Sequence, residues 1–305
     1  LEEFGDATEL ERSKYKIRTQ FKPDISLSKD ADAYSQDFLK QLIIDCEHQH
    51  ISLRPLQNRV IFGAPSESTD EFRQTLKAIA LKAGFGSVSI IDEPKGAIFY
   101  HLQRKDITAS EANQGTLVVD FGGGTCDFAL VVRGEIKHSW GDMLLGGRLL
   151  DDLFFQWFLE QNPEALIKMQ EDGSEFFVLW YLCRLVKEKF SQSMALDRTT
   201  VFRRVVGEFG RISNVTWDDF IKRAQTYSPS STFSEYLQRV QSNSSGIVNA
   251  GVSIDILDWF RLSLRNGLLH EHVMKFNISC VILTGGSSSW SFVPDIIMEE
   301  MESIG

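Results

Sequence analysis

Three consecutive glycines between two aspartates are the residues of this chain best placed to do chemistry. The segment from Leu117 to Val131 contains an apolar strand, the turn Gly122-Gly123-Gly124-Thr125 and a second strand. Because glycine has no side chain, successive backbone N–H groups can approach one anion and point at it together. Asp120 and Asp127 lie at the two strand ends, where carboxylates could hold a hydrated Mg²⁺ against that anion. The same residues also fit an ordinary hairpin with a glycine turn and two solvated aspartates.

Two further glycine pairs follow this hairpin. Leu145-Gly146-Gly147 precedes a predicted amphipathic helix over about 148–160, and an apolar strand over 279–284 ends in Gly285-Gly286-Ser287. Backbone amides at such turns can meet an anionic ligand. A Gly-Gly turn after a strand is common, so the second pair is a weak signal by itself.

The elements that would position these residues begin at Arg59. The apolar run Arg59–Phe62 predicts a strand, which an amphipathic helix over about 69–84 and a strand at Val88–Ile91 follow. Strand, helix and strand in so few residues predict a βαβ unit and therefore a parallel sheet. Glu93-Pro94 comes directly afterwards, and a carboxylate at this strand-to-helix corner faces the crevice where open α/β sheets bind ligands.

The hairpin begins a second lobe after the polar stretch 104–114, which we interpret as a hinge or crossover. A helix predicted over about 176–191 carries Lys187, a strand region follows over 199–208, and Thr216 is placed to cap a further helix. Lys187 is a candidate ligand residue, although an exposed, solvated side chain is the usual state of a helix lysine. Two lobes would then bracket one ligand site.

Composition excludes several classes of protein. With 305 residues, 43% of them hydrophobic, the chain can form two lobes that each have a core. A net charge of −10 without a dense Lys/Arg run argues against nucleic-acid and anionic-membrane partners. No apolar run reaches the roughly 20 residues that cross a bilayer, and Leu1–Asp6 is not a signal peptide, so we expect a cytoplasmic protein. Four scattered cysteines indicate neither disulfides nor a zinc site.

Taken in order, these segments resemble the nucleotide-binding domain of the seventy-kilodalton heat shock (DnaK-like) family, within the actin-like ATPase superfamily. The resemblance spans most of the chain, and Phe4–Ala7 also resembles the Gly-Asp-Ala turn of that family. Five segments occur in the family's order and at about its separations: Val60–Pro65, Ile91–Ala97, Asp120–Asp127, Leu145–Gly147 and Leu283–Ser287.

The resemblance implies an α/β protein with the actin-like ATPase (ribonuclease H-like) fold, in which a nucleotide cleft separates two lobes. The first lobe would cover 1–111, with a small subdomain over about 1–55 and a sheet subdomain over about 56–111. The second would cover 112–305, with a sheet subdomain over about 112–145 and 250–305 and an inserted subdomain over about 146–249.

The resemblance also implies roles for individual residues around ATP or ADP and Mg²⁺. The metal would be reached mostly through water, and slow hydrolysis would rest on positioning and charge neutralisation. Clients and co-chaperones would bind through parts outside this chain. The implied catalytic and metal-site residues are Glu93, Asp120 and Asp127, the phosphate residues are Gly122, Gly123, Gly124, Thr125, Gly146 and Gly147, and the adenosine residues are Lys187, Gly285, Gly286 and Ser287.

The chain departs from the family pattern at several of these places. The family's first phosphate loop is missing, and Glu9 stands where the family has a lysine beside the γ-phosphate, so that Lys14 or Lys16 would have to substitute. Around the adenosine, the family's acidic and second basic positions are Arg184 and Glu188. Ser289 replaces an arginine, and the neighbouring Trp290 would pack either near the base or in the core.

The resemblance stops short at both ends, with an incomplete first lobe. A fragment of a longer protein explains this better than a reduced relative, because unpaired sheet edges are a liability. The implied function is that of an ATP-binding chaperone-type domain, and whether this chain alone binds or hydrolyses ATP stays open. One alternative is a non-catalytic interaction module with weak or lost nucleotide binding. Another is a different actin-like or sugar-kinase-like ATPase.

Overall fold

The computed structural model describes residues 22, 25–65, 68–142, 144–171, 174–230 and 253–304. These residues form an α/β structure with sheets of two, four and two strands. No helix within these ranges is long and apolar enough to cross a membrane. Cys46, Cys126, Cys183 and Cys280 are free thiols, in agreement with their scattered positions in the sequence.

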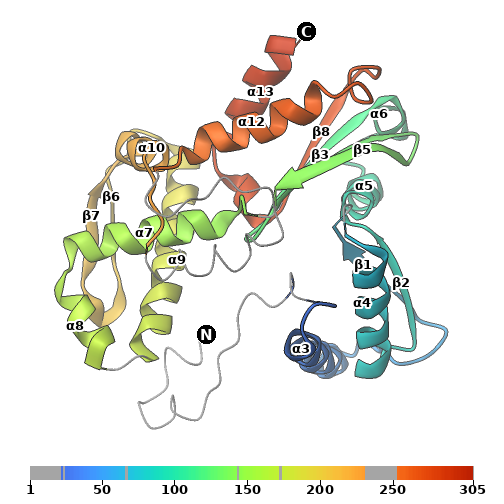
Figure 1. The fold of residues 1–305 in the computed structure, drawn as a ribbon, viewed down its shortest axis with the longest axis horizontal. Coiled ribbons are helices and arrows are strands. Elements are labelled where there is room, and N and C mark those ends of the chain that lie inside the picture. Colours follow the sequence, from blue (N-terminus) through green and yellow to red (C-terminus); the bar gives the residue numbers. More distant parts are fainter. Residues whose placement is uncertain are drawn as a thin grey trace.

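The predicted βαβ unit is confirmed. Strands β1 (Arg59–Ala64) and β2 (Ser87–Asp92) pair in parallel around helix α4 (Asp70–Ala83). The hydroxyl of Thr69 caps α4 by accepting from Phe72 N–H, and Gly84 ends it in the left-handed conformation. Helix α3 (Lys29–His48) packs against α4, and Ile43 and Ile79 lie in the core that they share. The four elements lie together at one side of the molecule (Figure 1).

The four-stranded sheet has the order β5-β4-β3-β8. Strands β3 (Thr116–Phe121), β4 (Cys126–Val132) and β5 (Glu135–Asp142) form an antiparallel meander, and β8 (Cys280–Thr284) pairs in parallel with β3. The predicted hairpin is therefore confirmed, and Asp120 is the direct partner of Asp127. β3 and β4 are buried on both faces, which explains their almost continuous apolar sequence.

One face of this sheet is covered by two helices. Helix α5 (Glu93–Arg104) begins with Pro94 in its first turn, as predicted, and contacts both the β1–β2 sheet and the four-stranded sheet. The stretch 104–114, interpreted from sequence as a hinge or crossover, contains the short helix α6 (Ala109–Gln114). A capping box between Thr108 and Glu111 stabilises its start, and Ala112 is buried against the sheet.

The other face packs against the largest core, whose elements form the opposite side of the molecule (Figure 1). Helix α9 extends further than the sequence predicted, whereas α7 and α10 begin close to the expected residues. The helices, strands and turns that surround this core are α7 (Gly147–Gln161), α8 (Glu164–Glu171), α9 (Ser174–Leu196), β6 (Phe202–Val205), the 3₁₀ turn η2 (Gly207–Phe209), β7 (Arg211–Val215), α10 (Trp217–Gln225), α12 (Ile256–Leu268), the 3₁₀ turn η3 (Gly286–Ser289) and α13 (Phe292–Ile304).

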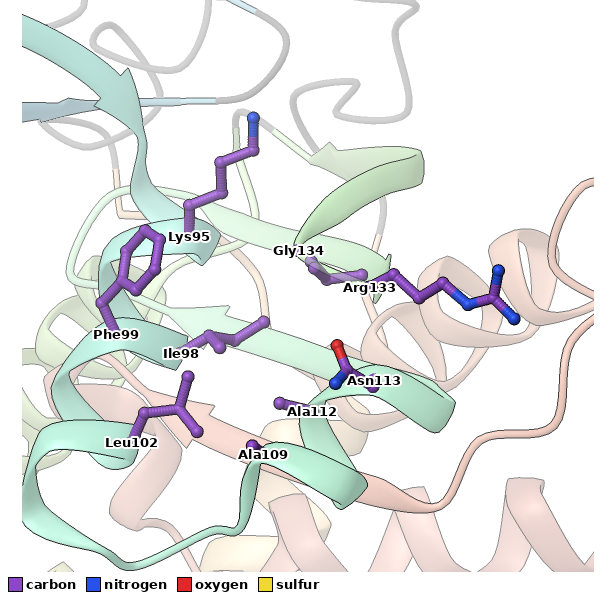
Figure 2. A pocket seen from close by; sticks show the side chains of 10 residues that line it. Lys95, Ile98, Phe99, Leu102, Ala109, Ala112, Asn113, Arg133 and Gly134 are labelled. Atoms are coloured by element: carbon purple, nitrogen blue, oxygen red, sulfur yellow. The ribbon is translucent and has the colours of Figure 1, made fainter.

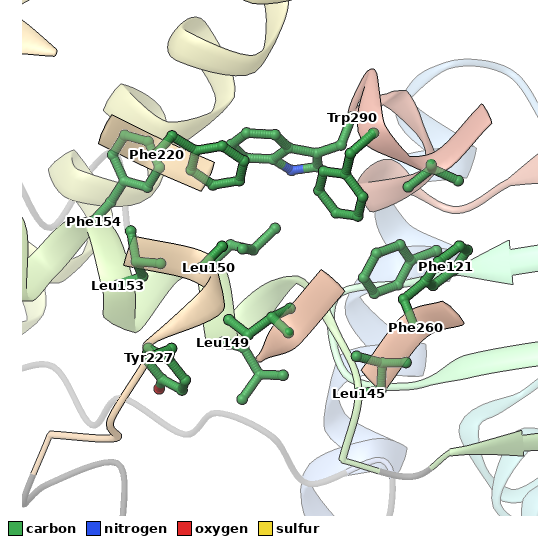
Figure 3. Close-up of a cluster of buried hydrophobic side chains, with 14 of the residues drawn as sticks. Phe121, Leu145, Leu149, Leu150, Leu153, Phe154, Phe220, Tyr227, Phe260 and Trp290 are labelled. Carbon is green, nitrogen blue, oxygen red and sulfur yellow. The ribbon is translucent and has the colours of Figure 1, made fainter. Parts of the chain in front are cut away.

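Aromatic rings fill this core (Figure 3). Phe121 from β3 stacks on Phe260 from α12 with ring centroids 5.3 Å apart. Trp290 is only 2% exposed and stacks on Phe220 with ring centroids 4.6 Å apart. Of the two positions that the sequence left open for Trp290, the structure therefore supports the core. The core ties the end of β3, and with it the glycine turn, to the helical side of the molecule.

Candidate functional site

The three glycine segments singled out in the sequence meet at the end of β3. The carbonyl groups of the turn accept hydrogen bonds from the start of α7: Gly147 N–H donates to Gly122 O over 3.0 Å, and Arg148 N–H to Gly123 O over 2.9 Å. The Arg148 guanidinium donates to Gly124 O. From η3, the Ser287 hydroxyl donates to Gly122 O over 3.0 Å. Segments far apart in sequence therefore build one site.

This close approach requires glycine at two positions. A Cβ atom at position 146 would lie 2.5 Å from the carbonyl carbon of Gly124, so any side chain there would separate α7 from the turn. Gly285 has φ +83°, and a Cβ on it would lie 2.5 Å from Oδ1 of Asp120. These two glycines therefore allow the segments of the site to come together, in addition to any role in binding a ligand.

Three amide groups of the turn, on Gly123, Gly124 and Thr125, have no acceptor among the described residues. A Cβ on Gly123 or on Gly286 would meet nothing within 4 Å. The turn is therefore polarised: its carbonyl groups bind α7, and the amide groups of Gly123, Gly124 and Thr125 have no acceptor among the described residues. Such a concave run of N–H groups fits a phosphate oxygen.

Carboxylates flank this cradle. Asp127 Oδ2 accepts from the Thr125 hydroxyl over 2.8 Å, and residues directly opposite in antiparallel strands, such as Asp120 and Asp127, project from the same sheet face. Partial burial raises the pKa of Asp120, the nearby Glu93 carboxylate raises it further, and Lys22 opposes the change. A cation beside Asp120 and Glu93 would relieve this repulsion.

The carboxylates do not form a ready-made ion cage. Among the described residues, no three carboxylate, imidazole or thiol groups are close enough to hold one metal ion. A magnesium ion at Asp120 and Asp127 would therefore keep most of its water ligands, as Mg²⁺ commonly does in nucleotide sites. Carboxylate oxygens are the donors that Mg²⁺ prefers, so this donor set fits the ion.

The sequence did not predict two cations near the site, Lys22 and Arg148. Lys22 Nζ lies 2.9 Å from Glu93 Oε1, whereas Glu9, Lys14, Lys16 and the turn Phe4–Ala7 lie outside the described residues. No spacing signal in the sequence connects position 22 with position 93. Arg148, which follows the Gly146-Gly147 pair directly, was missed although its place in the chain puts it next to the turn.

Lys187 is buried, so the exposed, solvated state that is usual for a helix lysine does not apply to it. Its side chain is 7% exposed, and its Nζ lies 2.6 Å from Asp151 Oδ1 of α7. Helices α7 and α9 pack side by side, so the lysine on one helix reaches the carboxylate on the other. Arg184 forms its ion pair within α9, with Glu188, over 3.0 Å.

A separate pocket lies between α5, α6 and the turn after β4 (Figure 2). Its lining combines apolar residues such as Ile98 and Leu102 with the cations Lys95 and Arg133. None of the predicted site residues lines it. The candidate site is therefore the cradle formed by residues 122–125 and its neighbours, and not this pocket.

Comparison with known proteins identifies relatives. Residues 29–169 match the family model described as MreB/Mbl protein. The chain is 34% identical over 243 residues to Chaperone protein dnaK3 of Synechococcus elongatus. The aligned residues cover 78% of this chain and 28% of that protein. It is 24% identical over 271 residues to Chaperone protein DnaK of Deinococcus deserti, and this alignment covers 87% of the chain and 38% of that protein.

A third relative, Chaperone protein dnaK of Guillardia theta, is 29% identical over 177 residues, or 54% of this chain and 27% of that protein. The chain thus spans well under half the length of these curated relatives. The matches confirm the resemblance and the fold class predicted from the sequence, while the roles of single residues and the lobe boundaries stay predictions. The chain therefore contains part of a nucleotide-binding domain of the DnaK-like heat shock type, built on the actin-like ATPase fold.

Proposed function

We propose that the chain binds ATP and ADP together with Mg²⁺, as the nucleotide-binding part of a chaperone-type ATPase. The observation that carries the proposal is the polarised turn: the three adjacent N–H groups of Gly123, Gly124 and Thr125 have no protein acceptor in the described structure. The β- and γ-phosphates are the acceptors that such a cradle suits. Bound Mg²⁺ would supply charge neutralisation at the phosphates.

In this proposal the carboxylates divide the work. Asp120 and Asp127 would hold the metal through its water ligands, and Thr125 keeps Asp127 in position through its 2.8 Å hydrogen bond. Glu93, at the first turn of α5, orients the attacking water. Catalysis of hydrolysis would rest on positioning and charge neutralisation, without a covalent intermediate.

The adenosine side is proposed to involve Gly285, Gly286 and Ser287. Gly286 borders open space, whereas the Ser287 hydroxyl is already bonded to Gly122 O and supports the turn. Lys187 would contact the ribose or base only by exchanging its partner Asp151. We further propose, from the chaperone relatives, that the whole protein acts in the cytoplasm on client proteins with co-chaperones.

A second candidate function is a non-catalytic interaction module. The ion pair between Lys22 and Glu93 favours it, because a water-orienting carboxylate that is bound to a lysine is not available to water. The two functions differ in whether nucleotide displaces this ion pair. Binding of nucleotide without hydrolysis would support the second function.

Calorimetric titration of the chain with ATP and with ADP, both with Mg²⁺, tests the proposal, together with single-turnover hydrolysis. Asp120→Asn should slow hydrolysis at least tenfold and change the dissociation constant for ATP much less, because the water-held metal would lose its orientation. Asp106→Asn removes a carboxylate outside the site and is the matched control. Absence of saturable binding by the folded chain would refute the proposal, and an unchanged rate would remove Asp120 from the mechanism.

A further inference from the structure

The two-stranded sheet of β6 and β7, at the margin of the helical side of the molecule (Figure 1), has one closed edge. Gln161, the last residue of α7, donates from Nε2 to Ser213 O over 3.1 Å and accepts from Ser213 N–H over 3.0 Å. Asn162 Nδ2 donates to Arg211 O over 2.9 Å, and Arg211 N–H donates to Asn162 Oδ1 over 3.2 Å. These two side chains therefore occupy the outer edge of β7 as a neighbouring strand would.

The opposite edge of this sheet, along β6, is open. Val206 N–H donates to Gly210 O over 2.8 Å, and the next pair along the ladder joins Val205 to Arg211. Because hydrogen-bonded and non-bonded pairs alternate in an antiparallel ladder, Val205 directs its N–H and C=O away from β7, and so does Arg203. Among the described residues, none bonds to these outward groups. Strand β6 therefore presents an unpaired edge, which can accept a further strand.

The side chains along this edge are exposed and cationic. Val205 is 71% exposed and Val201 is 58% exposed, while Arg203 and Arg204 are exposed neighbours. Within the described ranges, neither arginine forms an ion pair. The only acidic residue between 202 and 215 is Glu208, whose carboxylate already lies 3.8 Å from a lysine of α8. The edge therefore combines apolar side chains with uncompensated positive charge.

This charge discriminates between possible partners. Two copies of the chain that paired through β6 would bring the two Arg203-Arg204 pairs together, and like charges on neighbouring strands are destabilising. A partner strand with carboxylates would avoid this repulsion and gain opposite-charge pairs across the ladder. At physiological salt the Debye length is about 8 Å, so the local arginines, and not the net charge of −10, decide the attraction at this edge.

We infer that β6 binds an extended acidic segment of a partner protein, which adds to the β6–β7 sheet as a third strand. The outward backbone groups of Arg203 and Val205 supply hydrogen bonds for any strand, and the arginines select an acidic one. The exposed valines contact its apolar side chains. The inference does not rest on nucleotide binding, because no residue of the turn 122–125 takes part.

Fluorescence anisotropy with a labelled, capped peptide tests the inference on the unaltered chain. The probe alternates valine and glutamate over about six residues, the usual length of a strand. It should bind saturably. A peptide with lysine in place of glutamate should bind about tenfold more weakly or less, because its charges face arginines. The acidic peptide N-methylated at alternate residues keeps its charge but loses backbone hydrogen bonds, and its affinity should also fall about tenfold.

Variants of the chain locate the site. Val205→Pro removes an outward N–H, a change that edge strands tolerate, and should weaken the acidic peptide about tenfold. The double variant Arg203→Gln with Arg204→Gln should weaken it about 3- to 10-fold through loss of two cross-strand charge pairs. Arg59→Gln with Arg104→Gln removes the same charge from β1 and α5 and is the matched control, with a change below about twofold.

The possible results separate the parts of the inference. Absence of saturable binding of the acidic peptide by the folded chain overturns it, as does equal affinity for the lysine peptide or for the N-methylated peptide. Equal weakening in the two double variants would indicate attraction by overall charge and would overturn the location at β6. Should Val205→Pro fail to fold, by circular dichroism, the N-methylated peptide on the unaltered chain decides. Titration with ADP is a separate measurement, so failure of the proposed function is distinguishable.

Discussion

The substitution Gly146→Ala tests the assembly of the site in its most sensitive place. The added Cβ would lie 2.5 Å from the carbonyl carbon and 2.7 Å from the oxygen of Gly124, well inside van der Waals contact. Because backbone lies on both sides, α7 and the turn must separate, which breaks the hydrogen bonds of Gly147 N–H and Arg148 N–H to the turn.

The magnitude follows from these contacts. Two hydrogen bonds are worth about 1 kcal/mol each, and overpacking adds about 1–3 kcal/mol. Replacing glycine by alanine restricts the unfolded chain, which returns about 0.4–1 kcal/mol. The free energy of unfolding of Gly146→Ala should therefore be about 3 kcal/mol lower than that of the unaltered chain.

Urea unfolding followed by tryptophan fluorescence measures this difference, because Trp290 lies in the adjoining core. Gly123→Ala is the matched control: its Cβ would meet nothing within 4 Å, so its free energy of unfolding should change by less than about 1 kcal/mol. Equal losses in the two variants, or a stable Gly146→Ala, would refute the close approach of α7 to the turn.

Three further predictions concern titrating and buried groups. Burial raises the pKa of Asp120, and the Glu93 carboxylate raises it further, so ionised Asp120 lowers the stability of the folded chain at neutral pH. Asp120→Asn should therefore raise the urea midpoint at pH 7. This gain should disappear below about pH 4, where the carboxyl group is protonated in the folded and the unfolded chain. The pKa of His138 is lowered, first by burial and then by His270, whose ring centroid is 3.9 Å away. The unfolded chain then binds more protons, so stability should fall as the pH drops below about 6.5, and His138→Gln should make this pH dependence shallower in urea titrations at pH 7.5 and 5.5. Asp152 is fully buried and accepts from Tyr227 OH over 2.7 Å, so Asp152→Ala should lower the free energy of unfolding by about 2–4 kcal/mol in the same assay, and a loss within error would show that the buried carboxylate is dispensable.

Local patterns explain what the sequence could predict. The βαβ unit follows from the period of apolar residues between Thr69 and Gly84, and the hairpin follows from two apolar runs around the glycines. The opposition of Asp120 and Asp127 follows from the symmetric placement of the turn between them. Each of these signals lies within a few residues of the structure that it specifies.

The features that the sequence did not predict depend on partners distant in the chain. Lys22 reaches Glu93, and Lys187 is buried because Asp151 of another helix faces it. Arg148 adjoins the glycine pair in sequence, but its contact with Gly124 depends on how α7 packs against the turn. Composition and periodicity carry no information on such side-chain pairs. The capping box of Thr108 and Glu111, by contrast, is a local signal for the start of α6 within an otherwise polar stretch.

The most direct test of the nucleotide site observes the amides of the turn themselves. In a chain labelled with ¹⁵N-glycine, titration with ADP and Mg²⁺ should shift the N–H resonances of Gly123 and Gly124 saturably, assigned through their loss in Gly123→Ala and Gly124→Ala. Gly134, in the turn after β4 and away from the cradle, serves as the internal control and should not shift. Unchanged Gly123 and Gly124 resonances at saturating nucleotide would contradict the phosphate cradle.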